Sequence, residues 1–260
     1  MLEWYMYLLI IVGGCIAGFI NTLAGSGSLV TLPILIFAGL PATVANGTNR
    51  IAILLQNVVG VSSFSNKKVL DLKGVLYLGI PATIGSVIGA NIAVNINEEI
   101  MSRVIGVIMI LMLIVIIVKP KRWLVGTLEN LGSNVNIWHL ILFFFIGIYG
   151  GFIQAGVGIF LLSGLVLGIG YNVVRANAVK VGIVLFFTIF ALGVFIYNGQ
   201  VDFIIGFILA IGNMFGAWLG AKVAVEKGVV WIRRLLIVIV IISAANLLGV
   251  FDIISNLITG

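Results

Sequence analysis

Long apolar runs separated by short polar turns are the feature of this sequence that most restricts its fold. Eight runs reach or approach the roughly 20 apolar residues that a helix needs to cross a bilayer. They are Met6–Leu23, Asn46–Phe64, Leu72–Val94, Ile100–Val118, Ile137–Gln154, Ala178–Ile196, Phe203–Val225 and Val229–Leu248. With only 8% charged residues, the chain has too few polar groups to cover a water-soluble domain of its length. These observations predict an all-α polytopic membrane protein and exclude a cytosolic enzyme.

Two further apolar runs are too short to span a membrane, Leu29–Leu40 and Ile159–Gly170. Each follows a pair of glycines, Gly25 with Gly27 and Gly156 with Gly158. Glycine interruptions in apolar segments are typical of broken or re-entrant helices at transport sites. We therefore expect two short helices, each preceded by a break in the chain.

The sequence also repeats itself. A shift of 131 positions aligns Ala24–Gly27 with Ala155–Gly158 and Asp71 with Asp202. Each half then has four long runs and one short run, which predicts two membrane repeats. We place the N-terminal repeat at residues 1–118, a cytoplasmic linker at 119–136 and the C-terminal repeat at 137–260.

The distribution of basic residues decides between two topologies. If the short runs cross the membrane, twelve of the fourteen basic residues fall on one side, whereas they divide almost evenly if the short runs loop back. The positive-inside rule therefore favours an inverted five-plus-five helix repeat in the cell (inner) membrane, with both termini extracytoplasmic. The same dispersion among apolar runs argues against a nucleic-acid partner, despite the net charge of +6.

Arg50 is the most unusual single residue, because it lies in an apolar run with no acidic residue within twenty positions. A charge inside the bilayer is costly unless it faces a cavity or a partner. It is either a snorkelling side chain near a helix end or a contact for an anionic ligand. Lys180 occupies the position beside the repeat equivalent of Arg50, so each half brings one cation to the same structural place.

The glycine segments are the second candidate site. A broken helix exposes backbone N–H groups at the start of its short half, and such ends attract anions. We expect Leu29 and Ile159 to begin these halves, with Gly25, Gly27, Gly156 and Gly158 at the breaks. Further candidate ligand contacts are Ser26, Ser28, Asn21, Gln154, Thr48 and Asn49. The alternatives are that the glycines only allow close packing and that the polar run Asn46–Asn49 caps a helix.

Catalytic machinery is not expected. Asp71 and Asp202 each directly precede a long apolar run, which is the position of a helix N-cap and not of a proton carrier. The chain has one cysteine, one histidine and no Gly-Lys dipeptide, so we predict no zinc site, no nucleotide-binding loop, no cofactor and no enzyme activity.

Several of these motifs are similar to those of a known family. The run Gly18–Pro33, followed by Gly39-Leu-Pro41 and Ala45–Asn49, resembles the first signature of the TauE/SafE sulfite-exporter family, and Gly147–Gly158 resembles its second-half motif. The resemblance implies a secondary transporter or facilitator for sulfur-containing anions such as sulfite, sulfoacetate or related organosulfonates.

The alternative function is a non-transporting membrane scaffold or assembly partner. The expected partners are a small anionic substrate and the lipid bilayer. A proton as coupling ion and a homo-oligomer are both compatible with this interpretation.

Overall fold

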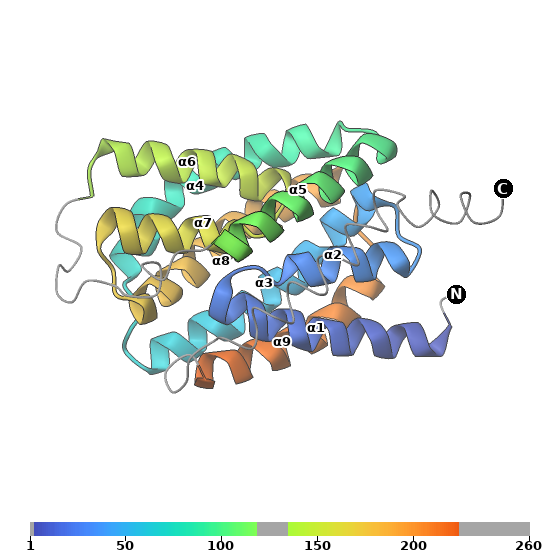
Figure 1. Ribbon diagram of the computed structural model, residues 1–260, viewed down its shortest axis with the longest axis horizontal. Coiled ribbons are helices and arrows are strands. Elements are labelled where there is room, and N and C mark those ends of the chain that lie inside the picture. Colours follow the sequence, from blue (N-terminus) through green and yellow to red (C-terminus); the bar gives the residue numbers. More distant parts are fainter. Residues whose placement is uncertain (1–2, 119–134, 224–260) are drawn as a thin grey trace.

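The structure is a bundle of helices lying along one common direction (Figure 1). The computed structural model describes residues 3–118 and 135–223. Within these residues the helices are α1 (Trp4–Ala24), α2 (Ser28–Phe37), α3 (Ala42–Asn66), α4 (Leu72–Val94), α5 (Glu98–Val118), α6 (Ile137–Phe152), α7 (Val157–Ser163), α8 (Val173–Tyr197) and α9 (Phe203–Val223). A short π-helix, η2 (Gly164–Ile169), directly continues α7. The all-α prediction is confirmed for this part of the chain.

The two predicted helix breaks are present. α1 ends at Gly25, whose φ is 75°, and α7 begins after Gly156, whose φ is 74°. These left-handed conformations suit glycine, because other L-residues pay a steric penalty there. The short helices start at Ser28 and Val157, slightly before the expected Leu29 and Ile159.

The helix bounds follow the 131-residue shift found in the sequence. Moving the bounds of α3 by this shift gives those of α8, and α9 begins where the shifted α4 begins. The positive-φ residues also pair, as Gly25 with Gly156, Gly39 with Gly170 and Lys68 with Gly199. Both halves therefore bend their backbone at matching positions.

The most extensive helix contacts in the described chain are between α1 and α9 and between α4 and α6. Both pairs pack through glycines. A Cβ atom at Gly216 would lie 1.9 Å from the Cys15 carbonyl oxygen, and one at Gly89 would lie 1.9 Å from that of Ile148. Small residues let membrane helices approach until their backbones touch. We call these contacts the two glycine seams; each joins a helix of one sequence half to a helix of the other.

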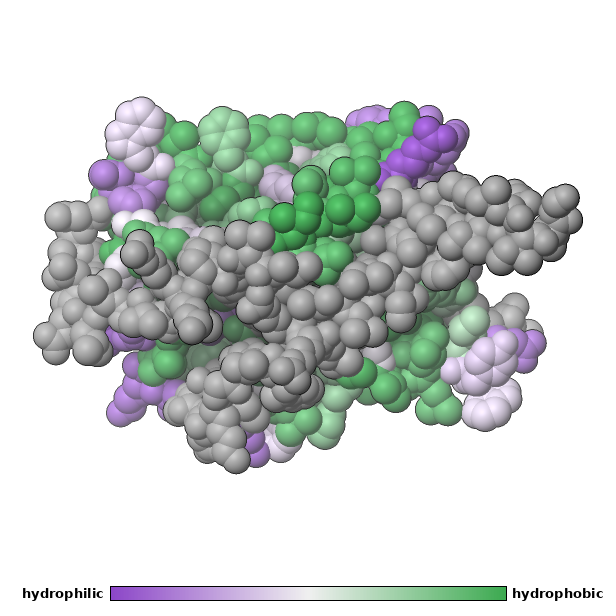
Figure 2. Space-filling model, viewed as in Figure 1, coloured by the Kyte–Doolittle hydropathy of each residue, from purple (hydrophilic) through white to green (hydrophobic). Residues whose placement is uncertain are grey.

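The outer surface is suited to lipid. On α4, every fourth residue from Leu72 to Ile92 is a leucine or isoleucine that is at least 42% exposed. An apolar stripe of this length facing water would promote aggregation, whereas lipid chains solvate it. Figure 2 shows apolar residues over the middle of the visible face and hydrophilic residues toward its ends. Among the described residues α1, α4, α8 and α9 are long and apolar enough to cross a membrane.

The helix starts confirm some predicted caps and correct another. Asp71 accepts a hydrogen bond from the Gly74 N–H at 3.1 Å and Asp202 one from the Ile205 N–H at 2.9 Å, so both aspartates are N-caps. The polar run Asn46–Asn49 does not cap α3, which contradicts that alternative, because the helix already begins at Ala42.

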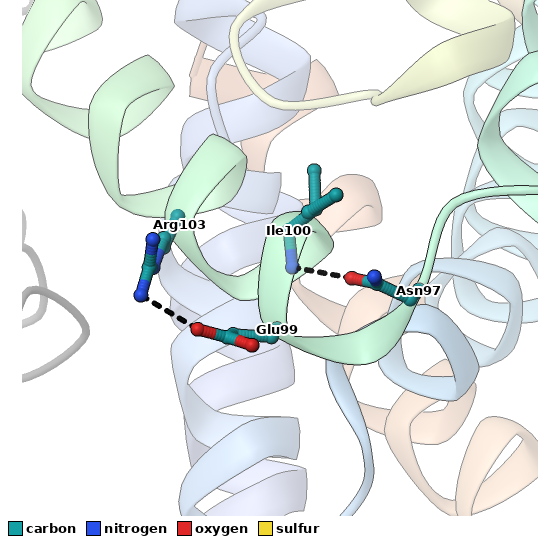
Figure 3. Close-up of polar contacts among 4 residues, drawn as sticks. All are labelled: Asn97, Glu99, Ile100 and Arg103. Carbon is teal, nitrogen blue, oxygen red and sulfur yellow. Dashed lines mark hydrogen bonds and ion pairs between the residues drawn. The ribbon is translucent and has the colours of Figure 1, made fainter.

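The start of α3 is capped by Glu98 instead. Its carboxylate accepts hydrogen bonds from the backbone N–H groups of Ala42 and Thr43, the latter at 3.1 Å. The start of α5 itself is closed by Asn97, and an ion pair joins Arg103 to Glu99 at 2.6 Å (Figure 3).

All but the last two residues of the predicted linker lie outside the described residues, as do the run Val229–Leu248 and the basic residues from Lys227 onward. The first residue of α8 also differs from the expectation. Asn172 accepts a hydrogen bond from the Arg175 N–H at 2.9 Å, which starts the helix five residues before the apolar run.

Candidate functional site

The two helix breaks meet at the centre of the bundle. The Gly158 N–H donates to the Gly25 carbonyl oxygen at 3.0 Å. A Cβ atom at Gly25 would lie 2.5 Å from the Gly158 Cα atom. The backbones of the two breaks are therefore in direct contact, and any side chain at either position would separate them.

A small internal cavity lies beside this contact. Its volume is about 10 Å³, close to what one water molecule requires. It is lined by Asn21, Ser28, Ile53, Asn57, Gln154, Val157, Gly158, Lys180 and Val184. The lining includes Ser28 and Val157, which are the first residues of α2 and α7, so both short helices begin at the cavity.

Lys180 supplies a cation to the cavity wall. Its side chain is only 2% exposed. The ammonium group donates to the carbonyl oxygens of Asn21 at 3.0 Å and Thr22 at 3.3 Å, and to Asn177 Oδ1 at 2.9 Å. Two of these acceptors belong to the last turn of α1, so a residue of α8 stabilises the negative end of α1.

Arg50 has the equivalent role in the other half. It is fully buried and donates to the carbonyl oxygens of Gly150 at 3.2 Å and Gly151 at 2.6 Å, in the last turn of α6. Its guanidinium carbon lies 4.4 Å from the ring centre of Phe195. Arg50 does not line the cavity, and the snorkelling alternative is wrong because the side chain is buried among helices.

These two contacts give the site its electrostatic arrangement. The C-terminal ends of α1 and α6 carry partial negative charge, and each receives a cation from the opposite sequence half. The N-terminal ends of α2 and α7, which carry partial positive charge, face the cavity. The helix ends that repel anions are thus compensated by side chains. The dipoles of α2 and α7 favour an anion at the cavity, while first-turn N–H groups such as those of Gly158 and Ile159 already donate to the Gly25 and Gly156 carbonyls.

The other predicted site residues are distributed around this centre. Asn21, Ser28, Gln154, Gly158 and Lys180 line the cavity together, while Gly25 contacts Gly158. Gly27 packs on the Ala17 carbonyl, Gly156 on Met112, and Ser26 is buried with a hydroxyl oxygen that has no partner. Thr48 and Asn49 lie apart from the cavity lining. Thr48 Oγ1 accepts from the Asp202 N–H at 2.8 Å, and Asn49 Oδ1 accepts from Thr31 at 2.7 Å.

Sequence reasoning missed four lining residues, Ile53, Asn57, Val157 and Val184. A signal was present for Asn57, because a polar side chain within an apolar span usually faces the protein interior. It lies seven positions after Arg50, two helical turns along the same face of α3. The three aliphatic residues resemble their neighbours and carried no signal.

The helices around the cavity form two packed units that do not match the sequence halves. One unit contains α1, α2, α3 and α9, and the other contains α4, α6, α7, η2 and α8; the main contact between them in the described chain is that of α3 with α8. The first unit contributes Asn21, Ser28, Ile53 and Asn57 to the cavity, and the second contributes the remaining lining residues. The cavity therefore lies at the interface of the two units.

Two sets of turns close the opposite ends of the bundle. At one end, Tyr171 donates to Asp71 Oδ2 at 2.6 Å and Lys67 donates to the Ala221 carbonyl at 2.7 Å. These turns bring together Lys67, Lys68, Lys73, Arg175 and Lys222. At the other end, Glu98 contacts the start of α3 and Gln200 donates to the Val94 carbonyl at 3.0 Å.

The Asp71 carboxylate is stabilised in its charged form. Burial alone raises its pKa, but hydrogen bonds from Tyr171 and from the Gly74 and Lys73 N–H groups, with the charge of Arg175, lower the pKa below its ordinary value. Burial and the hydrogen bond to Asp71 raise the pKa of Tyr171. The N-cap, the Tyr171 hydrogen bond and the nearby charge of Arg175 account for the lowered pKa of Asp71.

No group of three or more His, Cys, Asp or Glu side chains in the described residues is arranged to hold a metal ion. The polar groups that converge at the cavity are amides, a hydroxyl, backbone N–H groups and an ammonium. This set suits a small anion.

Comparison with known proteins agrees with this chemistry. Residues 10–247 match the family described as Sulfite exporter TauE/SafE. The chain is 28% identical to the "Probable membrane transporter protein ORF9" of Sinorhizobium sp., over 95% of this chain and 94% of that protein. It is 25% identical to a "Probable membrane transporter protein" of Haemophilus influenzae (90% and 91% covered) and 27% identical to "Probable membrane transporter protein YfcA" of Escherichia coli K12 (90% and 86%). No solved structure matches the chain.

Proposed function

The chain belongs to the TauE/SafE family of multi-pass membrane transporters, and on this premise we propose that it moves a small sulfur-containing anion, such as sulfite or an organosulfonate, across the cell membrane. The family membership also confirms that the protein is not an enzyme. The observation that carries the proposal is the cavity between the two helix breaks, where two helix N-termini and the Lys180 ammonium converge.

In this proposal Lys180 compensates the charge of the bound anion, and Ser28 and Asn21 donate hydrogen bonds to its oxygens. The dipoles of α2 and α7 add to the positive potential at the site. Arg50 acts as a positioning residue, since it fixes the end of α6 immediately before the second break. Gly25, Gly27, Gly156 and Gly158 allow the close approach of backbone that the cavity requires, and Ser26, Thr48 and Asn49 support the surrounding helices.

We further propose that the two packed units move against each other to open the cavity to one side at a time. The inverted five-plus-five arrangement, with residues 1–118 and 137–260 as repeats and both termini outside, is supported by the paired helix bounds and by the gathering of basic turns at one end. That end would be cytoplasmic.

The test is uptake of isotope-labelled sulfite and sulfoacetate into liposomes that contain the purified full-length protein, with protein-free liposomes as the control. We expect uptake of at least one of the two, inhibited by the other unlabelled sulfur anion and not by acetate. Equal rates with and without protein for both anions would favour the scaffold alternative.

A further inference from the structure

The hydrogen-bond acceptors that line the cavity indicate which groups the ligand carries, whereas the charge of Lys180 indicates only that the ligand is an anion. An anion needs donors around it, and the Ser28 hydroxyl and Asn21 provide them. The Lys180 ammonium, which donates to Asn21, Thr22 and Asn177, contributes its charge. The Asn21 Oδ1 atom accepts from the Gly27 N–H at 3.4 Å, which leaves its NH₂ group as the donor available to a ligand.

The other two lining amides, those of Asn57 and Gln154, have the opposite orientation, because their NH₂ groups donate within the protein. Asn57 donates its NH₂ group to the Ile53 carbonyl at 2.7 Å, one turn earlier in α3. A carbonyl oxygen only accepts, so this bond fixes the orientation of the amide and leaves Asn57 Oδ1 as the atom it can offer to the cavity. The side chain is 3% exposed.

Gln154 lies on the other side of the cavity with its NH₂ group bonded in the structure to a hydroxyl, which can accept or donate. Its NH₂ group donates to Thr188 Oγ1 at 2.8 Å, and its Oε1 atom is buried without a hydrogen-bond partner. Asn57 and Thr188 occupy equivalent positions under the 131-residue shift. Both halves thus place an amide oxygen, and not an amide nitrogen, at the site.

Two buried acceptors beside an anion site are unfavourable for a ligand that only accepts hydrogen bonds, because such a ligand leaves them unsatisfied. We propose that the cavity selects a monoanion that carries its own hydrogen-bond donor, with Asn57 and Gln154 as the specificity-determining residues. This inference rests on the proposed function and narrows its substrate class. The singly protonated form of sulfite meets the requirement through its hydroxyl group, and amino- or hydroxy-substituted sulfonates meet it through their substituent.

The experiment compares two anions that differ only in this donor. Sulfamate and methanesulfonate are both monoanions of nearly the same size, but the first has an NH₂ group where the second has a methyl group. We expect the purified full-length protein to bind sulfamate at least about tenfold more tightly in isothermal titration calorimetry, since a site built to hydrogen-bond a ligand discriminates strongly against the analogue that lacks the group.

Substitutions at the two residues test whether they cause the preference for sulfamate over methanesulfonate. In Asn57→Leu and Gln154→Met the preference should fall to within about twofold. Asn91→Leu is the matched control, because Asn91 makes the same bond to the carbonyl four residues earlier, at 2.8 Å, on the exposed side of α4; its preference should equal that of the wild type. Thr188→Val does not change a lining residue but frees the Gln154 amide to turn, and should also weaken the preference.

The outcomes separate this inference from the proposed function. Equal binding of the two anions by the wild-type protein, or an unchanged preference in Asn57→Leu, Gln154→Met and Thr188→Val, would overturn the donor requirement. If the protein carries sulfite but binds neither test anion, the donor requirement is again wrong and the transport function stands. If it neither binds these anions nor carries sulfite, both are wrong.

Discussion

At the scale of single residues, the two buried cations differ in what they face. Lys180 lines the cavity, whereas Arg50 contacts helix carbonyls and an aromatic ring away from it. The sequence drew attention first to Arg50, because only the folded chain reveals that the last turn of α6 supplies its acceptors. The difference predicts separate consequences for the two side chains.

We expect Lys180→Met to reduce the transport rate at low substrate concentration by about tenfold or more, because a hydrogen bond to a charged group contributes roughly 1.5–3 kcal/mol. Arg50→Met and Lys180→Met should both lower the melting temperature of the purified protein, since each leaves a helix end without its cation, but Lys180→Met should reduce transport more. Uptake and thermal unfolding are measured in parallel, with Arg103→Met, whose side chain is exposed, as the control. Normal uptake by Lys180→Met would remove it from the site.

Asp71 and Tyr171 give a residue-scale prediction for pH. The pKa of Asp71 is lowered in the folded protein, so its contribution to stability is present above the unfolded-state pKa and is lost as the pH falls through the folded-state pKa. Tyr171→Phe removes one hydrogen bond to the carboxylate and should cost about 1 kcal/mol near neutral pH. Thermal unfolding curves at acidic and neutral pH should converge for wild type and variant on acidification. Tyr197→Phe, at an 89% exposed side chain, should match the wild type at both pH values.

At the scale of helices, the glycine seams determine which elements stay together. A methyl group at Gly89 would overlap the Ile148 carbonyl on α6, and backbone atoms cannot move aside as a side chain can. Overpacking of this kind costs roughly 1–3 kcal/mol. Gly193, in α8, has no such neighbour and makes no comparable demand.

Gly89→Ala should therefore destabilise the purified protein, while Gly193→Ala should leave its stability unchanged or raise it slightly. Nothing lies within 4 Å of a Cβ atom at Gly193, and alanine favours a helix over glycine by up to about 1 kcal/mol. The melting temperatures of the two variants in the same detergent make the comparison. Equal destabilisation of both would mean that helix propensity, and not the seam, controls stability.

The helices themselves were largely predictable from the sequence. Apolar runs locate them because burial in lipid requires such runs, and α4 has the bounds Leu72–Val94 that the sequence predicts. The pairing of α1 with α9 and of α4 with α6 was not predictable, because similar glycine pairs could pack against several neighbouring helices of equal apolarity. Nor was Asn57 identified, because the direction of a single polar side chain depends on the packing of α3 against α8.

At the scale of the whole molecule, the two packed units differ from the two sequence repeats. Each packed unit combines helices from both halves, and Asn46 on α3 joins the two units near one end by donating to the Phe152 carbonyl on α6 at 2.9 Å. Lys67 with Ala221 joins two helices of the same unit. These two contacts allow a matched test of relative motion.

We expect transport to stop when cysteines at positions 46 and 152 are cross-linked, because that link prevents the units from separating. A cross-link of the same length between positions 67 and 221 should leave transport intact. Both pairs are introduced after replacing Cys15 by alanine, and uptake is measured before and after reduction of the link. Undiminished transport with the first pair cross-linked would show that the units do not separate at that end.

The α1–α9 seam also has a consequence for biosynthesis. α1 enters the membrane first, yet the helix that covers its glycine face is α9, which emerges only after both short helices have been made. Until α9 is made, the glycine face of α1 contacts lipid or an insertion factor in place of its partner helix. The final structure therefore forms late, after the ribosome has completed most of the chain, and neither half can finish folding without the other.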